Sequence, residues 1–123
     1  MHAADAPAGL LITADLFFSS KVTGTAAALG MRMDVAGMPA AAASRVAGGD
    51  YRCVIIDLAM PGLALADLMA ALPADPRPKV IAFAAHVETS RLQAARDAGC
   101  DLVLPRSRFS AELPRLLSEH LAG

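Results

Sequence analysis

The strongest constraint in the sequence is an apolar run that ends at a single carboxylate. Residues 53–56 read Cys-Val-Ile-Ile, Asp57 follows them, and Pro61 and Gly62 then form a turn. An unbroken apolar run bounded by turn residues is typical of a strand buried on both faces of a parallel sheet. Open α/β sheets bind ligands at the carboxyl ends of such strands. Asp57 is therefore the first candidate functional residue, and a simple turn-capping role is the alternative.

Short apolar runs alternate with helical patterns along the whole chain. Strands are predicted at residues 10–13, 31–36, 53–57, 79–84 and 102–104, and helices at residues 16–29, 39–46, 63–72, 89–98 and 110–121. The first helix is expected to turn an apolar side, made of Leu16, Phe17, Val22, Ala26 and Leu29, toward the core. Five β-α units with short connections predict an α/β fold, a flavodoxin-like doubly wound parallel sheet with helices on both faces.

The second strand indicates the order of the sheet. Apolar Met31, Met33 and Val35 alternate there with Arg32 and Asp34, so one face of this strand is expected to meet water at the sheet edge. This favours the strand order 2-1-3-4-5, in which the first and third strands are neighbours. The carboxylates that follow those two strands should then lie close together.

Composition narrows the class of protein. Of the 123 residues, 55% are hydrophobic and 19% charged, which predicts one folded domain over residues 1–123 with a core at about residues 9–121. The net charge of -1 favours no nucleic-acid partner. No apolar stretch is long enough to span a membrane. Cys53 and Cys100 lie in dissimilar contexts, which indicates reduced thiols and a cytoplasmic location.

Two acidic residues make a metal site the first chemical expectation. Asp15 and Asp57 follow neighbouring strands, and paired carboxylates suit a hard divalent cation such as Mg²⁺, which keeps several of its waters. His86 follows the strand at residues 79–84. It is either an exposed loop histidine or a group that reaches the Asp15–Asp57 pocket. In the pocket it would serve as a donor, or as a ligand for a softer metal such as zinc or manganese.

Two stretches resemble one known family. Residues 54–62, Val-Ile-Ile-Asp-Leu-Ala-Met-Pro-Gly, are similar to the third strand and phosphoacceptor loop of response-regulator receiver domains in two-component signalling. Residues 94–101 resemble the family's turn into its fifth strand. The resemblance implies that Asp57 accepts a phosphoryl group from a histidine kinase. It also implies that an acidic pair after the first strand, Asp57 and the backbone carbonyl of Ala59 hold Mg²⁺.

The chain departs from the family pattern at four positions. The acidic pair aligns with residues 14–15, Ala-Asp, so only Asp15 remains. The hydroxyl residue after the fourth strand aligns with Ala84, and the aromatic residue of the fifth strand aligns with Val103. The family lysine aligns with Arg106, whose planar fork is not equivalent to a compact ammonium.

These departures predict an atypical, degenerate receiver domain. It is expected to be a protein-interaction module, not an enzyme, with impaired phosphorylation-dependent switching and weak Mg²⁺ binding. The alternative is a working phosphoacceptor that a histidine kinase phosphorylates on Asp57. The expected partner, a kinase or a downstream effector, would bind the face of the fourth helix, fifth strand and fifth helix. That face carries Arg91, Arg96, Arg106, Arg108 and Arg115. A flavodoxin-like enzyme is disfavoured because no Gly-rich phosphate loop, nucleophile elbow or Cys-x-x-Cys motif occurs.

Overall fold

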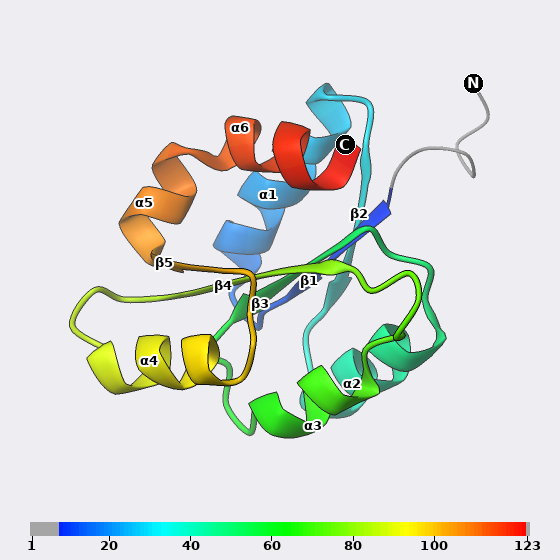
Figure 1. Cartoon of the computed structure of the whole chain (residues 1–123). Helices are drawn as coiled ribbons and strands as arrows, with labels where there is room; N and C mark the ends of the chain where they lie inside the picture. Colours follow the sequence, from blue (N-terminus) through cyan, green and yellow to red (C-terminus); the bar gives the residue numbers. More distant parts are fainter. Residues whose placement is uncertain (1–7, 123) are drawn as a thin grey trace.

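Five strands form one parallel sheet in the order β2-β1-β3-β4-β5 (Figure 1). The computed structural model describes residues 8–122, so residues 1–7 and 123 of the predicted domain lie outside the described part. The strands are β1 (Ala8–Ile12), β2 (Arg32–Ala36), β3 (Cys53–Asp57), β4 (Lys79–Ala84) and β5 (Leu102–Pro105). Every neighbouring pair of strands is parallel. The predicted order, with β2 at an edge, is confirmed.

Helices cover both faces of the sheet (Figure 1). α1 (Leu16–Ala28), α5 (Arg106–Ala111) and α6 (Leu113–Leu117) lie on one face, followed by a π-helical turn η2 (Ser118–Ala122). α2 (Pro39–Gly48), α3 (Leu65–Ala71) and α4 (Thr89–Asp97) lie on the other. Within residues 8–122 no helix combines the length and the apolar character needed to cross a bilayer.

The sheet separates two apolar layers because successive strand side chains point to opposite faces. Leu10, Val54 and Val80 pack toward α2, α3 and α4. Their neighbours Leu11, Ile55 and Ile81 pack toward α1, α5 and α6. All three central strands are therefore buried on both faces, as the unbroken apolar run of β3 predicts.

Glycines end two of the helices. Gly30 follows α1 with φ +75° and Gly99 follows α4 with φ +94°. This left-handed conformation is strained for residues with a Cβ atom and is common just beyond a helix C-terminus. The predicted helix ends at these two glycines are confirmed.

The buried side of α1 differs from the sequence prediction. Phe18, Val22 and Ala26 face the core, whereas Leu16 is 81% exposed and Phe17 is 93% exposed. The exposed Leu29 also lies off the core-facing side. Three apolar residues in a row leave the phase of a helix undecided, and the i, i+4, i+8 spacing that begins at Phe18 gives the continuous buried side.

The C-terminal helix also differs from prediction. A single helix at residues 110–121 is wrong, because α5 begins at Arg106 and ends at Ala111 and a second helix, α6, begins at Leu113. Pro114 lacks an N–H and is tolerated only in a first helical turn, so the chain starts a new helix there. The predicted buried residues of this region are confirmed, namely Leu113, Leu116 and Leu117.

Candidate functional site

Asp57 ends the central strand β3 at the carboxyl edge of the sheet and is only 4% exposed. Its Oδ1 accepts a hydrogen bond of 3.0 Å from the Ala59 N–H in the turn that follows. The Leu58 N–H donates to the Phe83 carbonyl, which extends the pairing of β3 with β4 by one bond. A carboxylate that is almost fully buried requires such donors, because an unpaired buried charge is very costly.

Thr13 supplies the second donor to Asp57, and the sequence predictions did not include it. The residue directly follows β1, is 2% exposed, and donates from its hydroxyl to Asp57 Oδ2 at 2.7 Å. The same hydroxyl oxygen accepts a bond of 3.1 Å from the Asp15 N–H. The sequence did contain a signal for Thr13, because Thr13 and Asp57 are both polar residues at the end of an apolar strand.

Asp15 caps α1 and does not contact Asp57 directly. Its Oδ1 accepts a bond of 3.0 Å from the Phe18 N–H, and Oδ2 lies 3.4 Å from Arg106 Nη1. The Phe18 hydrogen bond, aided by the nearby Arg106 guanidinium, lowers the pKa of the Asp15 carboxyl below its ordinary value. Asp15 therefore has two structural roles, as a helix cap and as an ion-pair partner.

Arg106 joins the two carboxylates. As the first residue of α5, it reaches across the ends of the strands to Asp57 Oδ2 with Nη2, at 3.3 Å, while Nη1 contacts Asp15. Its Cζ lies 4.9 Å from the centre of the Phe18 ring and 5.5 Å from that of Phe83. Arginine suits this place because its planar fork can pair with two acceptors and stack on aromatic rings at the same time.

A cluster of three aromatic rings includes the two rings, Phe18 and Phe83, over which the guanidinium lies. Phe83 and Phe109 stack with 4.8 Å between ring centres, and Phe18 tilts against Phe83 at 4.8 Å. The three rings come from α1, β4 and α5, and Phe109 is completely buried. This aromatic cluster links the position of Arg106 to the apolar core.

Solved structures share this fold. The response regulator receiver domain protein (CheY-like) from Methanospirillum hungatei has a TM-score of 0.81 at 14% identity, over 96% of this chain and 95% of its own. The Francisella response regulator 1452 receiver domain has a TM-score of 0.78 at 20% identity, over 94% and 97% of the two chains. The signal receiver domain from Bermanella marisrubri has a TM-score of 0.78 at 17% identity, over 97% and 100%. This is the receiver-domain fold. No family model and no curated protein matches the sequence.

The end of β4, which pairs with β3 and β5, carries no hydroxyl. Ala84 is the last residue of β4, is 1% exposed, and is paired with Pro105 of β5. Val103 on β5 is half-buried and pairs with Ala82, so neither a hydroxyl nor an aromatic ring stands at these two positions. The two positions that the resemblance aligns with the family's hydroxyl and aromatic residues thus hold an alanine and a valine.

The oxygen atoms of Asp15 and Asp57 are not arranged to bind a magnesium ion in this structure. Asp15 and Asp57 each already share an oxygen with Arg106, and the Ala59 amide occupies the other Asp57 oxygen. Among residues 8–122 no group of three or more histidine, cysteine or acidic side chains is placed to hold a metal ion. Mg²⁺ has a strict octahedral geometry and loses its waters reluctantly, so it competes poorly for carboxylates that are already paired.

His86 lies beside the site in the loop after β4. Its side chain is exposed and lines a cavity of about 410 Å³ together with Phe18, Ala85, Arg106, Ser107 and Ser110. No hydrogen bond or ion pair joins His86 to Asp15 or Asp57 in the described part of the chain. The structure thus brings Arg106 to both carboxylates and leaves His86 at the rim of the adjoining cavity.

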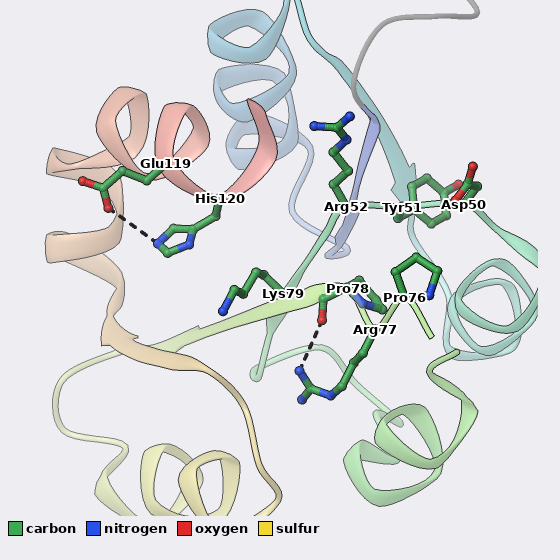
Figure 2. Close-up of a pocket in the computed structure, with 9 residues that line it drawn as sticks. All are labelled: Asp50, Tyr51, Arg52, Pro76, Arg77, Pro78, Lys79, Glu119 and His120. Atoms are coloured by element: carbon green, nitrogen blue, oxygen red, sulfur yellow. Dashed lines mark hydrogen bonds and ion pairs between the residues drawn. The ribbon is translucent and has the colours of Figure 1, made fainter. Parts of the chain in front are cut away.

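A larger cavity lies at the opposite edge of the sheet (Figure 2). It has a volume of about 650 Å³ and is lined by Asp50, Tyr51, Arg52, Pro76, Arg77, Pro78, Lys79, Glu119 and His120. Its lining comes from the amino ends of β3 and β4 and from the C-terminal turn, and includes both acidic and basic residues. None of the predicted site residues contributes to it.

The predicted partner face is less basic than its sequence suggests. Arg108 pairs with Glu112, Arg115 pairs with Glu112 and Glu119, and both arginines lie on the C-terminal helices. On α4, Arg91 pairs with Glu88 and donates to the Leu58 carbonyl at 3.3 Å. Acidic side chains three or four residues away thus offset the charge of Arg91, Arg108 and Arg115, so charge alone does not mark this face as a binding surface.

Proposed function

We propose that this chain is a receiver-type signalling module that acts mainly by binding a protein partner and has lost most phosphorylation-dependent switching. The observation that carries the proposal is Ala84, a buried methyl group where a switching receiver needs a hydroxyl. The partner is a histidine kinase or a downstream effector, bound at the face of α4, β5 and α5. The module is not an enzyme, and its unpaired cysteines fit the reducing cytoplasm.

The missing hydroxyl affects both the stability and the readout of a phosphorylated state. A phosphoryl group is stabilised by cations and donors around its oxygens. Loss of one neutral donor costs about 1–3 kcal/mol in a buried site. A ligand also shifts a conformational equilibrium only through contacts that differ between the two states. Ala84 has no hydroxyl and Val103 has no aromatic ring, so the contacts that would differ between the two states are absent there. A phosphoryl group on Asp57 would therefore shift the conformational equilibrium little.

The ground state of Asp57 opposes modification as well. Both of its oxygens already accept hydrogen bonds, from Thr13 and Arg106 on Oδ2 and from Ala59 on Oδ1. Three donors thus share the lone pairs of the carboxylate, which makes Asp57 a weaker nucleophile toward a phosphoryl donor. Mg²⁺ would bind weakly, in the millimolar range, because it competes with the guanidinium for Asp15 and Asp57.

The second candidate function is a working phosphoacceptor. Arg106 favours it, because a cation 3.3 Å from Asp57 could neutralise phosphoryl oxygens. Under this alternative, Arg106 would have to provide the conformational readout that Ala84 cannot.

The phosphoryl mimic beryllofluoride distinguishes the two functions. Amide chemical shifts are followed as beryllofluoride and Mg²⁺ are added to the wild type and to Asp57→Asn. The proposal expects either no binding, or changes confined to the surroundings of Asp15, Asp57 and Arg106. Tight binding with changes across residues 83–115, abolished by Asp57→Asn, would overturn the proposal and establish a working switch.

Two further variants sharpen the test. Ala84→Ser adds a small hydroxyl at the end of β4 and is expected to spread the shift changes toward β5. Asp67→Asn removes an exposed carboxylate on α3 and serves as the control, which should titrate like the wild type. If Ala84→Ser leaves the titration unchanged, the missing hydroxyl at position 84 does not limit switching. The proposal then loses the observation on which it rests.

A further inference from the structure

We infer that Arg106 is the built-in counter-ion of Asp57 and Asp15, and that it keeps divalent cations out of this end of the sheet. The inference rests on the proposed function only in treating Asp57 as the phosphoacceptor position. The site is then insensitive to Mg²⁺ because the chain supplies its own cation.

The guanidinium occupies the position between the two acidic groups. Its two terminal nitrogens divide between them, with Nη1 at 3.4 Å from Asp15 and Nη2 at 3.3 Å from Asp57. A single cation that contacts both carboxylates is the arrangement that a bridging metal ion would otherwise provide. The rings of Phe18 and Phe83 below Cζ fix the plane of the fork.

A free ion would have to displace this cation. The chain holds Arg106 in place, so its binding loses no translational entropy, whereas an incoming Mg²⁺ must also shed tightly held waters. The three charges of Asp15, Asp57 and Arg106 sum to -1, which attracts a divalent ion less than the two carboxylates alone would. The cost of binding a free ion and the reduced negative charge of the site both favour Arg106 over Mg²⁺ as the cation at this site.

Thr13 also disfavours a metal ion, because it places a neutral hydroxyl and not a carboxylate beside Asp57. Its hydroxyl lies 2.7 Å from Asp57 Oδ2, so a carboxylate at position 13 would stand where two acidic groups can share one cation. Threonine supplies a neutral donor there instead. The two features are complementary, because a hydroxyl can donate to Asp57 while a second carboxylate would need a counter-ion of its own.

Magnesium titrations of charge variants test the inference without any phosphoryl mimic. Arg106→Met keeps an apolar stem over the aromatic rings and removes the charge. Thr13→Asp combined with Arg106→Met restores a second carboxylate beside Asp57. Affinity is read from amide shifts near Asp15 and Asp57, and from the change in thermal unfolding temperature when Mg²⁺ is added.

The wild type should show no saturable Mg²⁺ binding below millimolar concentrations. Arg106→Met should bind Mg²⁺ at least about tenfold more tightly, and the double variant more tightly again, because each change makes the site more negative by one charge. Arg108→Met is the matched control, since Arg108 lies in the same helix but pairs with Glu112 away from the site. It should leave Mg²⁺ affinity unchanged.

Two results would overturn the inference. One is submillimolar Mg²⁺ binding by the wild type at Asp57, and the other is an Arg106→Met affinity equal to that of the wild type. If Arg106→Met does not fold, Arg106→Lys replaces it, because one ammonium cannot bridge both carboxylates and should give an intermediate affinity. Submillimolar Mg²⁺ binding by the wild type would overturn this inference but would not decide the proposed function, which the beryllofluoride titration tests. A working switch in a site that excludes Mg²⁺ would overturn the proposed function and leave this inference intact.

Discussion

The Thr13 hydroxyl and Asp57 Oδ2 are joined by a hydrogen bond of 2.7 Å that links the carboxyl ends of β1 and β3. Both residues are almost completely buried, and they are the buried polar side chains of the described core. In such a place a neutral donor stabilises an ionised carboxylate without introducing a second charge. The bond therefore contributes to the stability of the sheet as well as to the chemistry of the site.

Removal of this hydroxyl should destabilise the fold measurably. Thr13→Val keeps the shape of the side chain but leaves Asp57 with one donor fewer and the Asp15 N–H without its acceptor. We expect a loss of about 1–3 kcal/mol in the free energy of unfolding, measured by urea denaturation. Thr25→Val is the control, because the Thr25 hydroxyl bonds only to the Lys21 carbonyl on the exposed side of α1. Equal losses in the two variants would show that Thr13 has no special role.

The aromatic cluster under Arg106 should carry a large part of the stability of α5. Phe109→Ala removes a fully buried ring that stacks on Phe83 and should cost about 3–5 kcal/mol. Phe17→Ala removes the same ring from a position that is 93% exposed and should change stability by less than about 0.5 kcal/mol. The comparison is made by thermal and urea unfolding. A costly Phe17→Ala would contradict the observed phase of α1.

The hydrogen bond that Asp15 accepts from the Phe18 N–H, aided by the ion pair with Arg106, should appear in the pH dependence of stability. Because the folded state lowers the pKa of Asp15, the folded protein binds fewer protons there than the unfolded chain does. Its contribution is present above the ordinary aspartate pKa of about 4 and is lost as the pH falls through the lowered value. Asp15→Asn should therefore be less stable than the wild type at neutral pH and approach it in strong acid. A stability difference that does not change with pH would contradict this assignment.

The two cysteines should differ in reactivity. Burial raises the pKa of Cys53 to about 12, and burial also raises the pKa of the half-buried Cys100 thiol. Only the thiolate reacts with alkylating reagents, so the folded protein should be modified slowly at Cys100 and not at Cys53. Intact mass measurement after iodoacetamide treatment checks this, and both residues should react in urea. Faster modification of Cys53 than of Cys100 in the folded state would contradict the prediction.

The central part of the fold could be predicted because local pattern decides it. An unbroken apolar run such as that of β3 has few alternatives to a buried strand, and the carboxylate that ends it is placed at the sheet edge by topology alone. The family resemblance aligns Arg106 with the family lysine, and the contact of its side chain with Asp57 is seen in the structure. Its bridge to Asp15 depends on where α5 begins, which the sequence places at the wrong residue.

The features that escaped prediction depend on contacts between distant residues. Thr13 reads locally as one more β-branched strand residue, and its partner Asp57 lies 44 positions away. In α1 the run Leu16, Phe17, Phe18 fits either of two helix phases, and only packing against Phe83 and Phe109 selects Phe18. Local propensity cannot report such choices, because the tertiary environment makes them.

Arg106 gives this end of the sheet a cation that cannot leave. A bound metal ion is lost when a chelator is added or when its supply falls, and a lysine or histidine can lose its proton. An arginine side chain is bonded to the chain and is not deprotonated in proteins. The cation beside Asp57 is thus part of the chain itself and does not depend on a supply of free ions. A partner that draws Arg106 away from Asp15 and Asp57 would expose the two carboxylates.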